Sequence, residues 1–147
     1  MKFENKKLTF KRSRKGVPCI WESLKDFNTM SRYSVLYSPE IERKYPILVK
    51  STEGFGERLV PIAVGDFLVK FFIDINGVGF TIFKIATIDS YSNESELVPI
   101  ARNDAKYAEF IFSDDISSLI EVSVLNSLLE KIRKMEEKLK KQKTCKN

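Results

Sequence analysis

The segment FLVKFFIDINGVGFTIFKIATI, residues 67–88, decides the fold of this chain. Apolar residues alternate along its first half, which is the period of a β-strand with one buried face. The Asn76-Gly77 dipeptide follows, and both residues accept the positive φ angles of a tight hairpin turn. Residues 80–88 then return as the partner strand. One face of the first strand consists of Phe67, Val69, Phe71, Ile73 and Ile75. We therefore predict a β-hairpin over residues 67–88.

The second face of this hairpin is also apolar over most of its length, because Leu68 and Phe72 lie on it with Phe83 and Ile85 opposite. A sheet that is apolar on both faces is covered on both faces. Turns and polar loops, among them residues 13–16 and 91–96, separate the other extended runs. These runs lie at residues 8–12, 17–21, 32–37, 45–51, 58–64, 97–101 and 107–112. We predict a mainly β fold, an antiparallel barrel or sandwich, over residues 1–113.

The pattern changes to a helical period from about Ser118. Ser118-x-x-Glu121 matches a capping box, and an apolar residue then recurs at spacings of 3, 4, 3 and 4. This predicts one long C-terminal helix over residues 115–143, within a segment 114–147 that belongs to the same structural unit. By content the chain is then α+β. The apolar seam consists of Leu125, Leu128, Ile132, Met135 and Leu139.

The seam has two interpretations. It can join two copies of the chain as a short coiled coil, or it can pack on the protein's own sheet. Residues 116–129 are apolar around much of the helix, which favours packing on the sheet. Residues 130–143 have a narrow seam and charged flanks, and we expect this half to project from the body.

Length and composition fit one globular domain with a charged, solvent-exposed surface, since 43% of the 147 residues are hydrophobic and 31% are charged. Lys70, Asp74 and Asn76 interrupt the most apolar window, so we expect no membrane span and no membrane partner.

Cys19 and Cys145 lie near opposite ends, which favours two thiols over a disulfide. We expect a cytoplasmic protein or a virion component. The bias toward Lys, Glu and Ile is typical of hyperthermophiles and of AT-rich genomes alike.

Positive charge is concentrated at the two ends of the chain. Residues 1–15 carry seven lysines and arginines and one glutamate, and residues 130–147 carry eight lysines and arginines and three glutamates. The body between them carries ten basic and sixteen acidic residues. Such segregation indicates ends that reach a polyanion or that dock on an acidic neighbouring subunit.

Catalytic motifs are weak in this sequence. Without histidine the commonest general base and metal ligand is missing, and we expect no enzyme activity, no cofactor and no metal. The remaining enzymatic alternative is a metal-dependent nuclease, in which Glu42 and Lys44 would combine with Asp66, Asp74 or Asp89.

The strongest functional signal is basic residues interleaved with aromatics near the N-terminus, because phosphates bind Lys and Arg while unpaired bases stack on rings. Phe10 and Trp21 are the candidate stacking residues. The alternative is that both rings face the core and the cations only solvate a turn. The candidate phosphate-binding residues are Lys7, Lys11, Arg12, Arg14, Lys15, Lys134, Lys138 and Lys141.

Two function classes therefore stay open. The first is a non-enzymatic protein that binds DNA or RNA by phosphate neutralisation. The second is an assembly protein or adaptor, such as a component of a virus or mobile element, that self-associates through its C-terminal helix and acidic body as a dimer or higher oligomer. The nuclease is a distant third.

Overall fold

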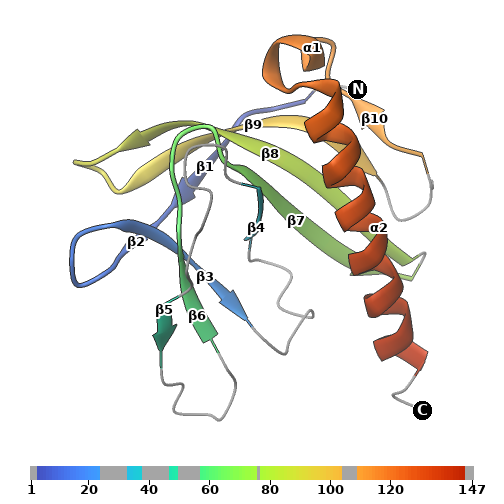
Figure 1. Ribbon diagram of the computed structural model, residues 1–147, viewed down its shortest axis with the longest axis horizontal. Coiled ribbons are helices and arrows are strands. Elements are labelled where there is room, and N and C mark those ends of the chain that lie inside the picture. Colours follow the sequence, from blue (N-terminus) through green and yellow to red (C-terminus); the bar gives the residue numbers. More distant parts are fainter. Residues whose placement is uncertain are drawn as a thin grey trace.

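The structure of the protein is a computed structural model that describes residues 3–23, 33–37, 47–49, 57–75, 77–103 and 109–144. Its strands form two antiparallel sheets (Figure 1). The first sheet contains β1 (Lys6–Thr9), β4 (Tyr33–Tyr37), β7 (Phe67–Asp74), β8 (Gly77–Asp89), β9 (Glu94–Asn103) and β10 (Ile111–Phe112). The second sheet contains β2 (Lys11–Arg12), β3 (Pro18–Ser23), β5 (Ile47–Val49) and β6 (Glu57–Pro61). Two helices follow, α1 (Ile116–Leu119) and α2 (Val122–Thr144).

The first sheet has the order β1-β9-β8-β7-β4, with β10 also paired to β9, and the second has the order β2-β3-β6-β5. In chain order the strands change sheet at Phe10, between β1 and β2, then between β3 and β4, between β4 and β5, and between β6 and β7. The predicted mainly β fold with a C-terminal helix is confirmed. The described strands form two open sheets, so the barrel alternative is wrong and the sandwich alternative fits.

The hairpin predicted over residues 67–88 is confirmed, since β7 and β8 pair from Phe67 opposite Lys84 to Asp74 opposite Gly77. Gly77 has φ of +127°, a value that glycine adopts without strain. Strand β8 continues to Asp89 and β9 begins at Glu94, so the loop expected at residues 91–96 is a shorter turn.

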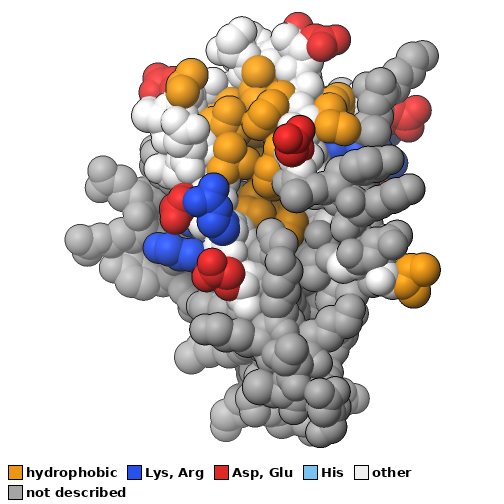
Figure 2. All heavy atoms as spheres, turned by 90° about the vertical axis from the view of Figure 1, so that its right-hand side faces the viewer, with side chains coloured by type: hydrophobic (Ala, Val, Ile, Leu, Met, Phe, Trp, Pro, Cys, Tyr) orange, Lys and Arg blue, Asp and Glu red, His pale blue; other side chains and the backbone are white. Residues whose placement is uncertain are grey.

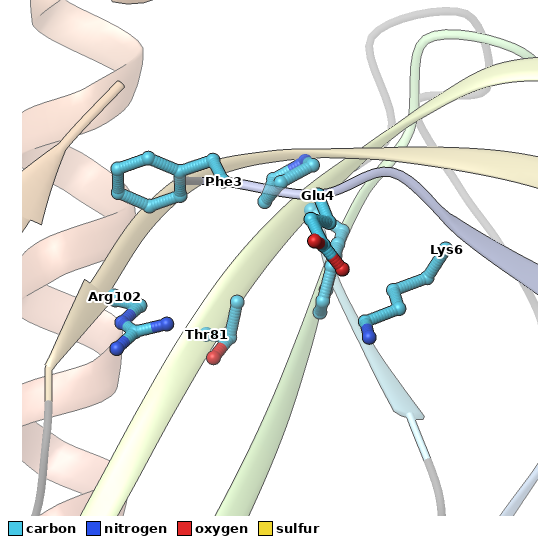
Figure 3. A pocket seen from close by; sticks show the side chains of 7 residues that line it. Phe3, Glu4, Lys6, Thr81 and Arg102 are labelled. Carbon is cyan, nitrogen blue, oxygen red and sulfur yellow. The ribbon is translucent and has the colours of Figure 1, made fainter. Parts of the chain in front are cut away.

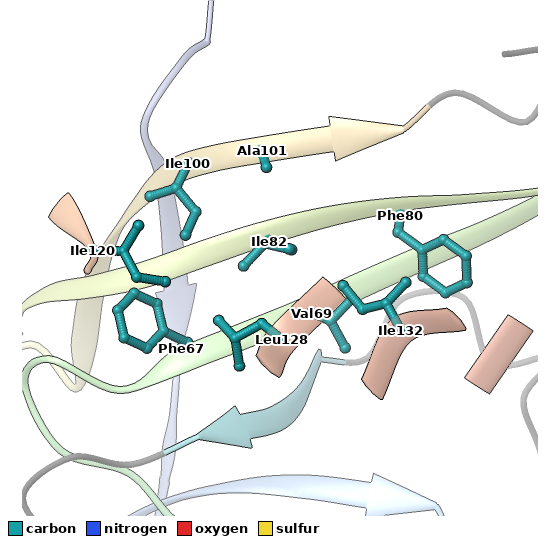
Figure 4. Close-up of a cluster of buried hydrophobic side chains, with 9 residues drawn as sticks. All are labelled: Phe67, Val69, Phe80, Ile82, Ile100, Ala101, Ile120, Leu128 and Ile132. Atoms are coloured by element: carbon teal, nitrogen blue, oxygen red, sulfur yellow. The ribbon is translucent and has the colours of Figure 1, made fainter. Parts of the chain in front are cut away.

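Both faces of the first sheet are covered, as its apolar residues predict. On one face α2 closes a core of buried side chains drawn from β7, β8, β9, α2 and the junction between α1 and α2 (Figure 4), namely Phe67, Val69, Phe80, Ile82, Ile100, Ala101, Ile120, Leu128 and Ile132. The other face packs on the second sheet through Phe10, Ile20, Val60, Ile62, Leu68, Phe83, Ile85 and Leu97. The fold is therefore three layers, with the first sheet in the middle.

The C-terminal helix differs from its prediction, because it is broken at Ile120. Ile120 has extended backbone angles, φ −154° and ψ 144°, and its side chain is buried in the core. The Lys84 ammonium donates a hydrogen bond to the carbonyl of Leu119 (2.8 Å), which satisfies an acceptor at the end of α1. The predicted capping box is not formed, because Ser118 lies inside α1 instead of preceding a helix, and its hydroxyl donates to the carbonyl of Asp115 (2.7 Å). Across the described ranges neither helix is long and apolar enough to cross a membrane.

The predicted seam packs mainly on the protein's own sheet. Leu128 and Ile132 are each only 1% exposed, and the half-buried Leu125 packs on the same cluster. Leu128 and Ile132 already fill the core of one chain, so in this structure their side chains are not exposed to a second copy. We expected residues 130–143 to project from the body. Because Ile132 is buried, the beginning of this segment still packs on the sheet. The side chains of Met135 and Leu139 lie outside the described residues.

Candidate nucleic-acid interface

The predicted turn at residues 13–16 is a fixed hairpin tip between β2 and β3. The Ser13 N–H donates to the carbonyl of Val17 (2.9 Å), and the Gly16 N–H donates to the carbonyl of Ser13 (2.9 Å). Gly16 has φ of +80°, which a side chain would strain. The side chains of Arg14 and Lys15 on this tip are exposed.

Arg12 ties this tip to the turn between β8 and β9, at residues 90–93. Its Nη1 donates to the carbonyl of Gly16 (2.7 Å), its Nη2 to the carbonyl of Ser90 (3.2 Å) and its Nε to Asn93 Oδ1 (2.9 Å). Its guanidinium also lies over the Phe10 ring, 5.3 Å from the ring centroid. One side chain therefore contacts both turns. Figure 1 shows both at the same, left-hand end of the molecule.

These contacts give Arg12 a structural role that the sequence did not predict. Three of its donors are directed at protein oxygens, so its guanidinium positions the two turns. We describe Arg12 as a positioning residue.

The stacking role predicted for Phe10 is wrong. Its ring is 3% exposed, and it packs in the core between the sheets with Leu68 and Phe83. Burial of an aromatic ring is strongly favourable, and the passage of the chain from β1 to β2 directs this side chain inward. The alternative considered for the sequence, a core-facing ring beneath solvated cations, is the observed one. The side chain of Trp21 lies outside the described residues.

The other N-terminal cations fall into two groups. Lys7 Nζ lies 3.9 Å from Glu94 Oε2, and both side chains are well exposed, so this ion pair is weak. Lys11, Arg14 and Lys15 are exposed. We call these three the basic tip.

The lysine-rich end of the chain lies elsewhere. Lys134 is exposed on α2, and the backbone of α2 also includes positions 138 and 141, whose side chains lie outside the described residues. Figure 1 shows α2 ending on the side of the molecule opposite the β2–β3 turn. The two predicted groups of cations thus do not form one shared surface.

Tyr91 is the feature that the sequence reasoning missed. It lies in the β8–β9 turn that Arg12 holds, and its side chain is fully exposed. The Tyr91 N–H donates to Asp89 Oδ1 (2.9 Å). This hydrogen bond and one from the Ser92 hydroxyl hold the pKa of the Asp89 carboxyl below its usual value. An aromatic residue inside a short polar segment between two strands was the available signal.

The acidic residues considered for a nuclease are not assembled as a metal site in the described ranges. Asp66 is fully buried, and its Oδ2 accepts a hydrogen bond from the Ala63 N–H (2.9 Å) in the tight turn before β7. Asp89 caps the β8–β9 turn. Glu42 and Lys44 lie outside the described residues. Among the residues that are described, no three Cys, Asp or Glu side chains come together as metal ligands.

A pocket of about 160 Å³ lies where the N-terminal segment crosses the first sheet (Figure 3). Lys6 and Arg102 supply positive charge to it, Thr81 supplies a hydroxyl, and Glu4 places a carboxylate among them. Because Glu4 would repel an anion at close range, this pocket is a poor phosphate site.

Comparisons with known proteins identify no relative. No protein-family model matches the chain, and neither a curated protein nor a solved structure is significantly similar to it.

Proposed function

We propose that this protein binds nucleic acid, without catalysing a reaction on it, through phosphate contacts at the basic tip. The observation that carries the proposal is the grouping of Lys11, Arg14 and Lys15 around a turn whose backbone is already fixed. A preformed turn loses little conformational entropy when it binds, and clustered cations release counterions from the phosphate backbone.

The test is a salt titration of binding, read by the fluorescence anisotropy of a labelled single-stranded oligonucleotide. The triple variant Lys11→Gln, Arg14→Gln, Lys15→Gln should lose at least about 10-fold in affinity at low salt. The slope of log affinity against log salt should fall by about 2, since each phosphate contact to a single strand contributes roughly 0.7.

The matched control removes the same charge at the other end of the molecule. Lys131→Gln, Arg133→Gln, Lys134→Gln changes three exposed cations on α2. Equal losses in the two triple variants would show that net charge, not the basic tip, determines binding. A wild-type protein that fails to bind at low salt would refute the proposal outright.

A second candidate function, head-to-tail self-association, is favoured by an exposed apolar face. Figure 2 shows hydrophobic side chains gathered on the side formed by α1, α2 and β10, with acidic side chains beside them. Val122 is 73% exposed, and Phe112 is exposed beside the stacked ring of Phe110. Asp114 and Glu121 are also exposed next to these elements. The complementary surface on a second copy is the basic tip with the exposed Val17.

Such a contact joins two different surfaces, so it would form rings or filaments rather than a closed dimer. Analytical ultracentrifugation at increasing protein concentration tests it. Phe112→Asp should dissociate the assembly, whereas Ile75→Asp, an equally polar change at a residue 98% exposed elsewhere, should not. A wild-type protein that stays monomeric at high concentration and low salt would exclude this second function.

A further inference from the structure

The β8–β9 turn presents one aromatic ring to solvent on a rigid support. The Tyr91 side chain is fully exposed, while the N–H of Tyr91 donates a hydrogen bond to Asp89 Oδ1. Asn93 closes the turn with φ of +55°, a conformation that asparagine tolerates better than most residues. The carbonyl of Asn93 accepts a hydrogen bond from the Phe10 N–H (2.9 Å), so the turn is attached to the buried strand connection at its base.

The turn that carries this ring is linked to the basic tip by a single guanidinium. Arg12 bonds Gly16, which follows Lys15, and it bonds Ser90, which precedes Tyr91. The two bonds are 2.7 and 3.2 Å long and come from the same guanidinium, so the carbonyl oxygens of Gly16 and Ser90 lie close together. An aromatic side chain and two exposed cations therefore project from adjoining turns.

The charges on the two turns determine whether each turn can contact a phosphate or a base. Asp89 ends β8 and Glu94 begins β9, so two carboxylates flank the turn that carries Tyr91, and only a weak ion pair joins Glu94 to Lys7. A phosphate is repelled from that turn and attracted to the basic tip. A neutral nucleobase is not repelled, and its π-face can stack on the tyrosine ring.

We propose that Tyr91 is a stacking site for an unpaired base of single-stranded nucleic acid whose phosphates contact the basic tip. The proposal rests on the proposed function and narrows it to single strands. Bases in a duplex are already stacked on one another and present only their edges, whereas every unpaired base offers a free π-face. Since stacking is insensitive to base identity, the site selects strandedness and not sequence.

The experiment compares Tyr91→Ala with wild type on a single-stranded oligonucleotide and on a duplex of equal length. Single-strand affinity should fall about 5- to 100-fold, in line with the effect of removing one aromatic stacking partner. Duplex affinity should change less than about 2-fold. Tyr91→Phe keeps the ring and should recover most of the single-strand affinity that the alanine variant loses.

The control is Ile75→Ala, which removes the exposed side chain from the turn between β7 and β8 and should alter neither affinity. If Tyr91→Ala binds single strands as wild type does while the basic-tip variant loses binding, stacking is refuted and the proposed function stands. If Tyr91→Ala weakens single-strand and duplex binding equally, stacking is again refuted, because the ring then contributes no selectivity. If wild type binds neither nucleic acid, both proposals fail together.

Discussion

The two cationic ends of the chain carry similar charge, yet they are attached to the body in different ways. Helix α2 is anchored by apolar side chains that complete the core beneath the first sheet. The basic tip is anchored by hydrogen bonds, above all those of Arg12, and its cations extend into solvent. Charge density along a sequence therefore does not distinguish an element that packs on the core from a turn whose cations are exposed. The two ends differ in their anchors, which are buried apolar side chains for α2 and the hydrogen bonds of Arg12 for the basic tip.

The largest effect is expected on the α2 side. Leu128→Ala should lower the free energy of unfolding by about 2–5 kcal/mol, because it removes a side chain that is 1% exposed and leaves a cavity. Urea denaturation measures this change. Val122→Ala, at the exposed start of the same helix, should stay within about 0.5 kcal/mol of wild type. A Leu128→Ala loss as small as that of Val122→Ala would contradict the packing of α2 on the sheet.

A smaller effect on stability is expected at the link between the two turns. Arg12→Gln should lower the free energy of unfolding by about 1–2 kcal/mol, because it removes charged hydrogen bonds and a contact with the Phe10 ring at a solvent-accessible site. Arg14→Gln, two residues along, should cost less than about 0.5 kcal/mol. Equal costs for the two arginines would show that Arg12 is not the anchor of the turn.

The smallest effect concerns the protonation of Asp89. Hydrogen bonds from Tyr91 and Ser92 lower the pKa of this carboxyl below 3.8, so the ionised form stabilises the β8–β9 turn. That contribution is fully present above pH 3.8 and is lost as the pH falls through the pKa of the folded state. The amide resonance of Tyr91 should titrate with a midpoint below 3.8, and Asp89→Asn should abolish the titration. A midpoint at or above 3.8 would contradict the hydrogen bond to the carboxylate.

Local patterns were sufficient to predict the hairpin at the centre of the middle layer, but not the order of that layer's other strands. Alternation in residues 67–75, the Asn76-Gly77 turn and the apolar second face together predict a hairpin covered on both sides. Each of these signals is read within a few residues of sequence. The helix break at Ile120 could not be read in this way, because it depends on burial of Ile120 and on the distant Lys84 at the end of α1.

The candidate site was predictable only in part, for the same reason. The basic turn and its Gly16 tip are visible in the sequence, and the turn is confirmed. The link between that turn and the one that carries Tyr91 depends on Arg12 and Asn93, which are 81 residues apart. Nor does the sequence separate Arg12, which bonds protein oxygens, from Arg14, which extends into solvent. Contacts between distant residues decide which cations are available for a ligand.

The most direct test of the central claim, that two distant turns form one binding site, is chemical-shift mapping by NMR. A short single-stranded oligonucleotide is titrated into the ¹⁵N-labelled protein. The account predicts that amide resonances of residues 11–17 and 90–93 shift together, with one common binding curve. Shifts confined to the C-terminal half of α2, or separate curves for the two turns, would contradict it.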